Sequence, residues 1–337
     1  MNHKQTLSII IVSYNTRDML GACLESIQKS SPDHVTVYVV DNASSDQSAD
    51  MVAEKYPDVV LIRNSKNVGF AEANNQALKL IQASYIMLLN ADTVMLPDTI
   101  RKVISFMDDH TDIGVSGCKL LNTDLTLQPS ATSYPSALKD TIAIALKGSF
   151  LSNNPTSRKW MSKLAKLLGF SASRFDDHSR IKEIGFPRGA CMIIRKKALD
   201  QVGLLDPDYF FTGEEMDLCY RIKKNKWRIV YFPDAAIIHH DHGSSNHMMG
   251  KVFVQTRKSA LLFYMKHYFP IHTILMKVMV SCVLLIHCMI LTLRFRWTKN
   301  KKELLTRREA YWYVVRLHFS AKFRKQNVFS EMKFKYQ

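Results

Sequence analysis

Carboxylates gathered in short segments are the side chains of this sequence best suited to chemistry. Glu214, Glu215 and Asp217 place three acids within four residues. Carboxylates this close tend to raise one another's pKa values, which suits a general base that works near neutral pH. A solvated acidic first turn of a helix is the other interpretation. The neighbouring Phe210 and Phe211 favour partial burial, so we expect this segment to accept a proton from a substrate.

A second group of polar residues follows four apolar runs of the first 92 residues. An Asp at the end of a buried strand can accept hydrogen bonds from a pyrimidine ring or a ribose hydroxyl, and an aromatic ring such as Tyr14 can pack on a base. Each group alone fits ordinary turn and cap chemistry. Their recurrence at every strand end favours a binding site, and the groups are Ser13-Tyr14-Asn15, Asp41 to Asp46, Arg63-Asn64 and Asn90-Ala91-Asp92.

Histidines cluster once, in His239-His240-Asp241-His242. Adjacent residues rarely point the same way and no Cys is nearby, so a structural zinc site is not expected. A single histidine that approaches a metal ion or a diphosphate is the better interpretation.

The elements that must position these residues alternate between strand and helix. Continuous apolar runs predict buried strands at 7–12, 35–40, 59–62, 85–89 and 113–118. Apolar residues at helical spacing predict helices at 19–27, 49–56 with Ser45 as a possible N-cap, 70–81, and 97–107 opened by Pro97. This alternation predicts an α/β fold whose mostly parallel sheet is flanked by helices. Ligands of such sheets bind at the carboxyl ends of the strands.

Phosphate-binding loops of the usual kinds are missing from the first strand-to-helix turn, which has neither a GxGxxG nor a GxxxxGK pattern. A bound diphosphate would therefore be neutralised by other groups.

The net charge of +16 is not spread evenly along the chain. Residues 251–337 carry 18 Lys and Arg against three acids, so they hold +15 of it.

Four strings of this sequence resemble inverting GT-A glycosyltransferases of family 2, in their rhamnosyltransferase-like branch. The match extends over about 240 residues, and its strings are Ser8 to Asn15, Val40 to Asp46, Asn67 to Ala71 with Asn74 and Asn75, and Leu88 to Thr93. The resemblance implies a pyrimidine-nucleotide sugar donor with Asp41 near the base. It also implies Mg²⁺ or Mn²⁺ on the diphosphate at Asp92, although Asn90 stands where the family's Asp-x-Asp pattern has its first acid.

The resemblance also implies roles for individual residues. The expected nucleotide-sugar-binding residues are Ser13, Tyr14, Asn15, Asp41, Asn67, Gly69, Asn74, Asn90 and Asp92. Segment 185–195 resembles the family's Gly-Ala strand, so donor or acceptor contacts are expected from Arg188, Gly189, Ala190 and Arg221. Glu215 stands where the family usually has Asp and is the expected base, with Glu214 and Asp217 in support. The metal ligands would be Asp92 and His240, which is favoured over His239.

The basic C-terminal region contains the most apolar stretch, Val278 to Leu293, flanked by Lys277 and Arg294. It is short for a membrane span, so a helix that lies in the membrane interface fits better than one that crosses it. Anionic head groups attract the flanking basic residues. A buried helix with a solvated charged flank is the alternative. Nucleic acid also suits a basic tail, but the stacking aromatics of the common modules are not arranged here, so no nucleic-acid partner is expected.

We therefore predict a GT-A domain at 1–250, with a nucleotide-sugar-binding half at 1–120 and an acceptor or catalytic half at 121–250. Residues 251–337 would form a basic, helical, membrane-associating region. The expected activity is sugar transfer with inversion, foremost of rhamnose from dTDP-rhamnose, to a saccharide acceptor that is lipid-linked, in cell-surface polysaccharide synthesis. A UDP-hexose donor, or a degenerate sugar-binding domain without catalysis, is the alternative. Six scattered cysteines indicate a reducing compartment, so the enzyme would act at the cytoplasmic face of the inner membrane.

Overall fold

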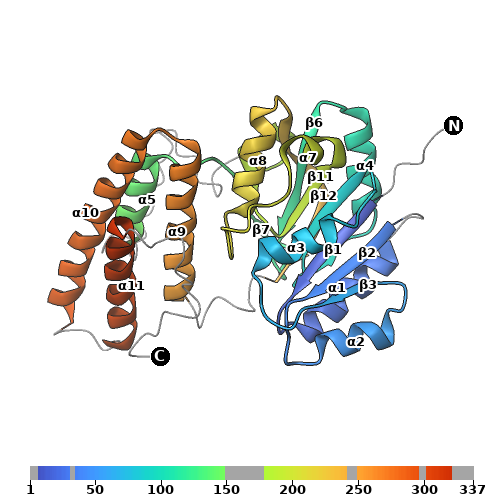
Figure 1. Ribbon diagram of the computed structural model, residues 1–337, viewed down its shortest axis with the longest axis horizontal. Helices are drawn as coiled ribbons and strands as arrows, with labels where there is room; N and C mark the ends of the chain where they lie inside the picture. Colours follow the sequence, from blue (N-terminus) through green and yellow to red (C-terminus); the bar gives the residue numbers. More distant parts are fainter. Residues whose placement is uncertain (1–6, 31–34, 149–177, 241–248, 296–300, 321–337) are drawn as a thin grey trace. The chain divides into compact units, whose positions relative to one another are not determined.

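The computed structural model describes residues 7–30, 35–148, 178–240, 249–295 and 301–320. Its contacts divide the chain into two compact units (Figure 1). The first unit comprises residues 1–134 and 176–243, and the second comprises 135–175 and 244–337. The sequence places 121–250 with the sheet, whereas the contacts group residues 135–175 with the C-terminal helices.

One large mixed sheet forms the centre of the first unit. Its strands in spatial order are β3 (Val60–Arg63), β2 (Val35–Asp41), β1 (Leu7–Ser13), β4 (Tyr85–Asn90), β11 (Cys191–Arg195), β6 (Ile113–Leu121), β12 (Arg228–His239) and β5 (Thr93–Met95). Strands β3, β2, β1 and β4 are parallel, as are β6 and β12, while β11 and β5 run antiparallel to their neighbours. The predicted α/β fold with a mostly parallel sheet is confirmed.

Short strands extend this frame where the sequence gives little signal. β7 (Leu127–Gln128) pairs with β6 and β9 (Lys182–Glu183) pairs with β12. β8 (Ala131–Thr132) and β10 (Phe186–Pro187) form a separate two-stranded ladder. These additions follow β6 and precede β11, in the region that supplies the second half of the site.

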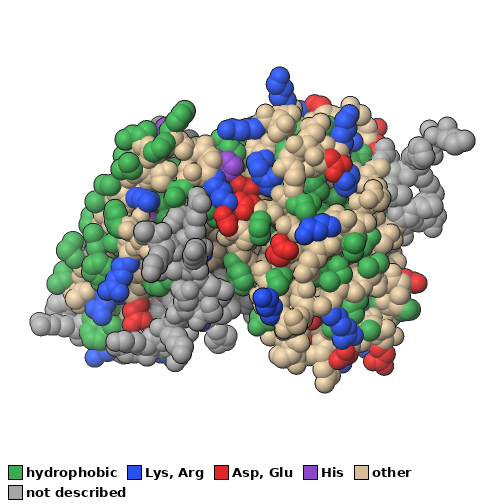
Figure 2. All heavy atoms as spheres, in the orientation of Figure 1, with side chains coloured by type: hydrophobic (Ala, Val, Ile, Leu, Met, Phe, Trp, Pro, Cys, Tyr) green, Lys and Arg blue, Asp and Glu red, His purple; other side chains and the backbone are tan. Residues whose placement is uncertain are grey.

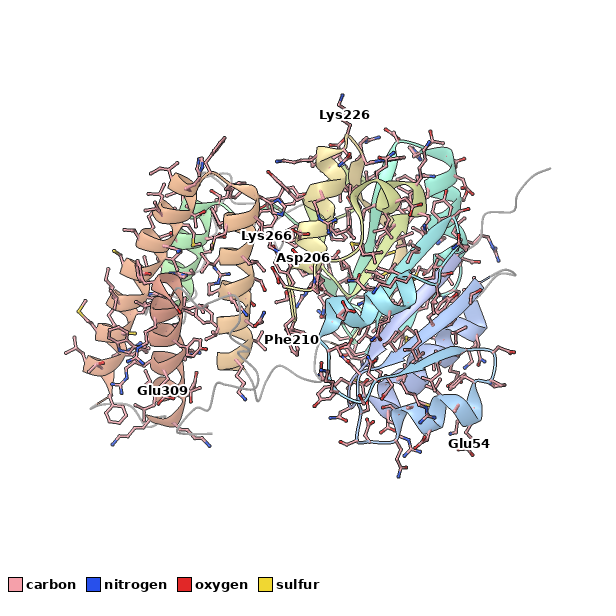
Figure 3. The ribbon with its side chains drawn as sticks, in the orientation of Figure 1. Glu54, Asp206, Phe210, Lys226, Lys266 and Glu309 are labelled. Atoms are coloured by element: carbon pink, nitrogen blue, oxygen red, sulfur yellow. The ribbon has the colours of Figure 1, made fainter. Side chains whose placement is uncertain are left out.

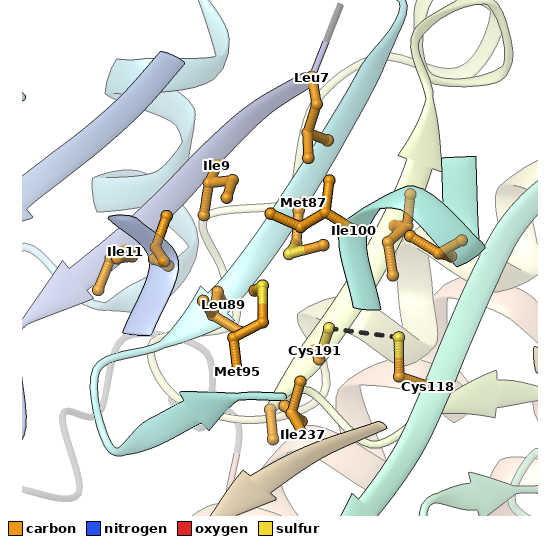
Figure 4. Close-up of a cluster of buried hydrophobic side chains, with 14 of the residues drawn as sticks. Leu7, Ile9, Ile11, Met87, Leu89, Met95, Ile100, Cys118, Cys191 and Ile237 are labelled. Atoms are coloured by element: carbon orange, nitrogen blue, oxygen red, sulfur yellow. Dashed lines mark hydrogen bonds between the residues drawn. The ribbon is translucent and has the colours of Figure 1, made fainter. Parts of the chain in front are cut away.

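Apolar side chains of the strands and covering helices form the core of this unit (Figure 4). Leu7, Ile9 and Ile11 of β1 and Met87 and Leu89 of β4 are almost entirely buried. This continuous burial explains why the strands appear in the sequence as unbroken apolar runs. The helices of the unit are α1 (Arg17–Ser30), α2 (Ser48–Lys55), α3 (Phe70–Leu78), α4 (Thr99–Asp109), α7 (Lys196–Val202) and α8 (Glu214–Lys224).

Two helices have starts that differ from those the sequence predicts. The N-cap of α2 is Gln47, in the left-handed region at φ 64°, and not Ser45. The side chain of Asp46 instead accepts hydrogen bonds from the Ser48 backbone N–H at 3.1 Å and from its hydroxyl. α4 begins at Thr99 after Asp98, so Pro97 precedes the helix and does not open it. The loop before α4 is therefore longer than the apolar spacing alone suggests.

The second unit consists of helices in its described parts: α5 (Ala137–Gly148), α9 (Met249–His267), α10 (Pro270–Arg294) and α11 (Lys301–Phe319). α10 packs against α5, α11 and α9. Its inward face is buried through residues such as Met276, Val280 and Leu284. Among the described residues, α10 is the one helix long and apolar enough to cross a membrane.

Candidate functional site

The carboxyl ends of β1 and β2 lie side by side at one edge of the sheet. Ser13 is in register with Asp41, and the Asn42 N–H donates to the Ser13 carbonyl at 2.8 Å. Asp41 is 4% exposed, and its Oδ2 accepts a hydrogen bond from the Ser44 N–H at 3.0 Å. Its Oδ1 is buried and has no hydrogen-bond partner among the described residues. A buried acceptor without a donor is costly, so Asp41 is prepared to bind an N–H or O–H of a ligand.

The loops around Asp41 are tied together by Asn15. Asn15 is in the left-handed region at φ 54°, and its Oδ1 accepts hydrogen bonds from the Ser45 N–H at 2.7 Å and hydroxyl at 3.2 Å. The backbone N–H of Asn15 donates to Ser44 Oγ at 3.0 Å. Asn15 therefore shapes the loop, while the preceding Tyr14 is half exposed and open to a ligand. Asp41, Ser44 and the β3 end also line a surface cavity of about 410 Å³.

Asn42, which was not among the predicted site residues, organises the loop before α3. Its Nδ2 donates to Asn67 Oδ1 at 2.9 Å, and its Oδ1 accepts from the Val68 N–H at 3.0 Å. Asn67 Oδ1 also accepts from the Gly69 N–H at 3.0 Å. The amide of Asn67 is thus used within the loop, which gives this residue a structural role.

Gly69 brings this loop against the segment before α8. Its φ of 89° suits glycine, and a Cβ added there would lie 2.8 Å from both the ring and the carbonyl oxygen of Phe210. The Phe70 N–H donates to that carbonyl at 2.8 Å, and Phe210 lies beside the start of α3 (Figure 3). Within α3, Asn74 Nδ2 donates to the Phe70 carbonyl while its Oδ1 is buried without a partner among the described residues.

The end of β4 carries Asn90 and Asp92. The Asn90 N–H donates to the Ala190 carbonyl at 3.0 Å, and its own carbonyl accepts the Thr93 hydroxyl at 2.7 Å. The side chain of Asp92 is 21% exposed. Burial alone would raise the pKa of Asp92, but the hydrogen bond and positive charge of His239 outweigh it and hold that pKa below its ordinary value. Asp92 is therefore ionised at neutral pH.

His239, and not His240, places its ring next to Asp92. His239 Nε2 lies 3.4 Å from Asp92 Oδ1, whereas His240 bonds to this residue through its backbone N–H, which donates to the Asp92 carbonyl at 2.9 Å. The geometry therefore favours His239 over His240, which the sequence favours, as the side chain that shares a ligand with Asp92. On its other side, His239 Nδ1 lies 2.7 Å from Gln128 Oε1. Both ring nitrogens of this buried histidine face polar partners.

Asp92 and His239 fit a divalent cation as a pair of ligands. Two octahedral ligands at about 2.1 Å from Mg²⁺ or Mn²⁺ stand about 3 Å apart, close to the 3.4 Å between Nε2 and Oδ1. No group of three His, Cys, Asp or Glu suited to a metal occurs among the described residues. This pair would leave most coordination positions of the metal ion to phosphate oxygens and water. The single carboxylate of Asn90-Ala91-Asp92 predicts the same.

The predicted base segment begins α8 and is buried. Thr212 at φ 60° and Gly213 at φ 101° turn the chain sharply, and the Gly213 N–H donates to Glu215 Oε2 at 2.8 Å. Glu214 is 4% and Glu215 9% exposed. Burial and the neighbouring Glu215 raise the pKa of Glu214 well above its ordinary value. Burial also raises the pKa of Glu215, but less, because backbone N–H groups and Glu214 donate to it. When the pair holds a single proton, that proton is therefore on Glu214.

The Gly-Ala segment joins the two acidic parts of the site. A Cβ on Gly189 would lie 3.7 Å from Glu215 Cδ, and the next residue, Ala190, bonds to Asn90. Arg188 is exposed, with its N–H bonded to the Ser130 carbonyl at 2.8 Å. Glu215 thus packs beside Gly189, and the residue after this glycine holds the backbone of Asn90.

Arg221 and Asp217 hold together the helices that surround the site. Arg221 Nε donates to Asp217 Oδ2 at 2.8 Å, and its other nitrogens donate to the carbonyls of Val202 and Leu204 at the end of α7. These bonds join α7 to α8, a structural role in place of the substrate contact expected for Arg221. Asp217 orients that arginine, one of the supporting roles expected for it.

These contacts form a continuous path around one sheet edge, from Asp41 through Gly69, Glu215 and Ala190 to Asp92. A sheet with such polar strand ends, no phosphate loop after its first strand and an acidic helix start is the arrangement expected from the resemblance to GT-A sugar transferases. The chain belongs to the family described as glycosyltransferase-like family 2, which matches residues 3–261. The family predicted from the sequence is therefore confirmed, and the protein is a glycosyltransferase.

Named relatives and solved structures agree with this assignment. The chain is 25% identical over 268 residues to the N-acetylglucosaminyl-diphospho-decaprenol L-rhamnosyltransferase of Mycobacterium tuberculosis, covering 76% of this chain and 83% of that protein. It is 30% identical over 105 residues to the Escherichia coli UDP-Glc:alpha-D-GlcNAc-diphosphoundecaprenol beta-1,3-glucosyltransferase WfaP, 31% of this chain and 42% of that one. The mannosyltransferase PcManGT of Pyrobaculum calidifontis, solved with GDP-Man and Mn²⁺, shares the fold at TM-score 0.54 and 14% identity, over 96% of this chain and 83% of that chain.

Proposed function

We propose that this glycosyltransferase moves a sugar, foremost rhamnose from dTDP-rhamnose, onto a lipid-linked saccharide with inversion at the anomeric carbon. The observation that carries the proposal is the path of contacts that brings Asp41, Asp92 and Glu215 to one sheet edge. The mycobacterial relative, named as a rhamnosyltransferase on a diphospho-decaprenol acceptor, supports the sugar and the acceptor class. The E. coli relative also acts on a diphospholipid acceptor but uses UDP-Glc, so a UDP-hexose is the second candidate donor.

The residues divide the reaction between them. Asp41 Oδ1 accepts a hydrogen bond from the pyrimidine or its ribose, and Tyr14 packs on the base. Asp92 and His239 would hold Mg²⁺ or Mn²⁺, which would supply positive charge for the leaving diphosphate. Glu215 removes the acceptor hydroxyl proton as that oxygen bonds to the anomeric carbon and the bond from this carbon to the diphosphate oxygen breaks. The proton ends on Glu215 and the electron pair leaves with the nucleoside diphosphate.

Glu214 supports the choice of Glu215 as base. Because Glu214 stays protonated, it donates a hydrogen bond to Glu215 and adds no second negative charge on the acceptor side. Glu215 also packs beside Gly189, which precedes the Ala190 carbonyl that holds Asn90. The degenerate, non-catalytic alternative would have no need for a buried carboxylate in this place, because burying its charge is costly.

The acceptor proposal includes the membrane. The outward face of α10 exposes a stripe of apolar residues at helical spacing, and apolar side chains gather over this helix in Figure 2. The stripe consists of Ile271, Ile274, Leu275, Val278, Ile286, Met289 and Leu293. Its inward face is covered by protein, so we propose that α10 lies in the membrane interface and does not act alone as a span. The six free cysteines support the cytoplasmic face of the inner membrane.

A donor panel tests the proposal. The full chain is incubated with Mn²⁺, a GlcNAc-diphospho-polyprenol acceptor and each of dTDP-rhamnose, UDP-glucose and UDP-GlcNAc, and lipid-extracted product is measured. We expect transfer from dTDP-rhamnose at least about tenfold above the others, since a site built for one set of hydroxyls rejects another. Preference for UDP-glucose would identify the second candidate. Absence of both transfer and hydrolysis with every donor would favour a non-catalytic domain.

A further inference from the structure

We propose that Gln128 of β7 is a positioning residue that fixes the tautomer of His239, so that Nε2 presents its lone pair to the divalent cation shared with Asp92. The inference rests on the proposed function, because it concerns the cation that the transferase would use. Gln128 lies in a short hairpin strand far from the acidic segments in sequence. It is 4% exposed, and His239 is 5% exposed.

The direction of a hydrogen-bond chain decides which atom of Gln128 faces the histidine. The chain starts at Asp124, whose carboxylate can only accept, and Oδ1 takes the Thr126 hydroxyl at 2.5 Å. Thr126 Oγ1 then accepts from Asn122 Nδ2 at 2.9 Å. Asn122 Oδ1 in turn accepts from Gln128 Nε2 at 3.1 Å. The amide nitrogen of Gln128 is therefore used toward Asn122, and its oxygen points to His239.

A carbonyl oxygen 2.7 Å from His239 Nδ1 requires a hydrogen on that nitrogen. With that hydrogen fixed on Nδ1, Nε2 is the nitrogen that faces Asp92, 3.4 Å from its Oδ1. Positive charge between Nε2 and the carboxylate stabilises the pair, and a metal ion that replaces a proton there is bound by the Nε2 lone pair. A divalent cation supplies that charge, and a ligating histidine usually donates its other N–H to such an outer partner.

Replacement of the amide tests this role. Gln128→Met keeps the length of the side chain and removes the acceptor, so we expect the Kd for Mn²⁺ to rise about 10–100-fold. Gln128→Glu keeps an acceptor opposite Nδ1 and should stay within about threefold of the unaltered protein. Thr126→Val breaks the chain at an exposed hairpin residue and should weaken Mn²⁺ binding by a smaller factor, about two- to fivefold, which tests the chain without a change in the buried site.

Binding is measured on the full chain from the electron paramagnetic resonance signal of free Mn²⁺, with and without dTDP. The ¹⁵N chemical shifts of His239 report the tautomer directly. The matched control is Gln201→Met, because Gln201 Oε1 also accepts from a ring N–H, that of Trp227 at 2.7 Å, at an exposed site. Its Mn²⁺ affinity should equal that of the unaltered protein. Thermal unfolding of each variant separates loss of binding from loss of fold.

Several results would overturn the inference. If folded Gln128→Met bound Mn²⁺ as tightly as Gln201→Met, Gln128 would be structural only, while the proposed cation site would stand. If the ¹⁵N shifts, recorded with diamagnetic Mg²⁺ in place of Mn²⁺, put the histidine hydrogen on Nε2 in the cation-bound protein, the tautomer argument would fail. If the unaltered protein and Asp92→Asn bound Mn²⁺ equally weakly, the cation pair of the proposed function would itself be wrong, and the role of Gln128 would fall with it.

Discussion

The adjacent glutamates at the start of α8 differ in charge although they have the same side chain. Burial and the charge of Glu215 favour the protonated form of Glu214, whereas four donors, three of them backbone N–H groups, favour the ionised form of Glu215. Glutamine resembles a protonated glutamate in shape and neutrality. We therefore expect Glu214→Gln to keep sugar transfer within about tenfold, and Glu215→Gln to lower kcat by about 10²–10⁴. Initial rates of transfer at saturating donor measure both.

If Glu214→Gln lowered kcat more than Glu215→Gln, Glu214 would be the base and Glu215 the protonated partner. Loss of transfer in both variants, with donor binding intact, would show that the pair acts as one unit with a shared proton. In either case the base would remain at the start of α8.

The raised pKa of Glu214 also predicts a change in stability with pH. The folded protein holds this proton more tightly than the unfolded chain, whose ordinary value is 4.5. The stability this contributes is complete below that value and is lost as pH rises through the raised pKa. Glu214→Gln cannot ionise, so it should unfold about 3 °C or more above the unaltered protein at pH 8.5 and at the same temperature near pH 4.5. Thermal unfolding monitored across this pH range checks the sign, and a variant less stable at pH 8.5 would contradict it.

At the scale of elements, the loop before α3 and the segment before α8 meet at Gly69. Gly69→Ala would bring a Cβ within 2.8 Å of Phe210 and place it at φ 89°. We expect a loss of about 1–3 kcal/mol in the free energy of unfolding and a raised KM for the donor. Denaturant unfolding and donor kinetics measure the two effects.

Gly203→Ala is the matched control for this prediction. Gly203 has a similar φ of 80° but nothing within 4 Å of an added Cβ. It should show the backbone strain alone, with no change in donor KM. Equal losses of stability in the two variants would mean that the close approach of Phe210 contributes nothing.

The elements of this fold differ in how far the sequence could predict them. β1, β4 and β6 were visible because both of their faces are buried, and β2 and β3 were visible as apolar runs although they are partly exposed. Asp41, Asp92 and Glu215 were visible because they follow apolar runs or cluster. Gln128 gave no such signal, since its partner His239 is 111 positions away. Simple alternation of residues along β12 could not predict whether His239 or His240 faces Asp92. A register shift between Phe232 and Ala236 interrupts the alternation of the two faces of this strand.

At the scale of the whole molecule, charge and apolar surface gather in the helical unit. Residues 251–337 carry +15, and Lys301, Lys302 and Arg307 are exposed on α11. We predict that the full chain binds phosphatidylglycerol vesicles more tightly than phosphatidylcholine vesicles, and that salt weakens this binding. Ile274→Glu should lower binding by about tenfold or more, because one buried isoleucine contributes about 1.5–3 kcal/mol. Vesicle co-sedimentation provides the measurement.

Leu80→Glu in the sheet unit provides the comparison, since Leu80 and Ile274 are both 56% exposed. It should leave vesicle binding unchanged. Equal effects of the two substitutions, or equal binding to neutral and anionic vesicles, would rule out α10 as the membrane-contacting face.

The sheet order has a consequence for how the protein is made. β5, which follows Asp92 directly, is held in the sheet by β12, and β12 ends at His239. β11 is likewise inserted between β4 and β6, and it directly follows Ala190, whose carbonyl accepts from the Asn90 N–H. A ribosome that has released only the first 120 residues has therefore exposed the carboxyl ends of β1, β2 and β4 without β11 and β12, which complete the sheet. The proposed cation pair of Asp92 and His239 is thus among the last parts of the sheet unit to be synthesised.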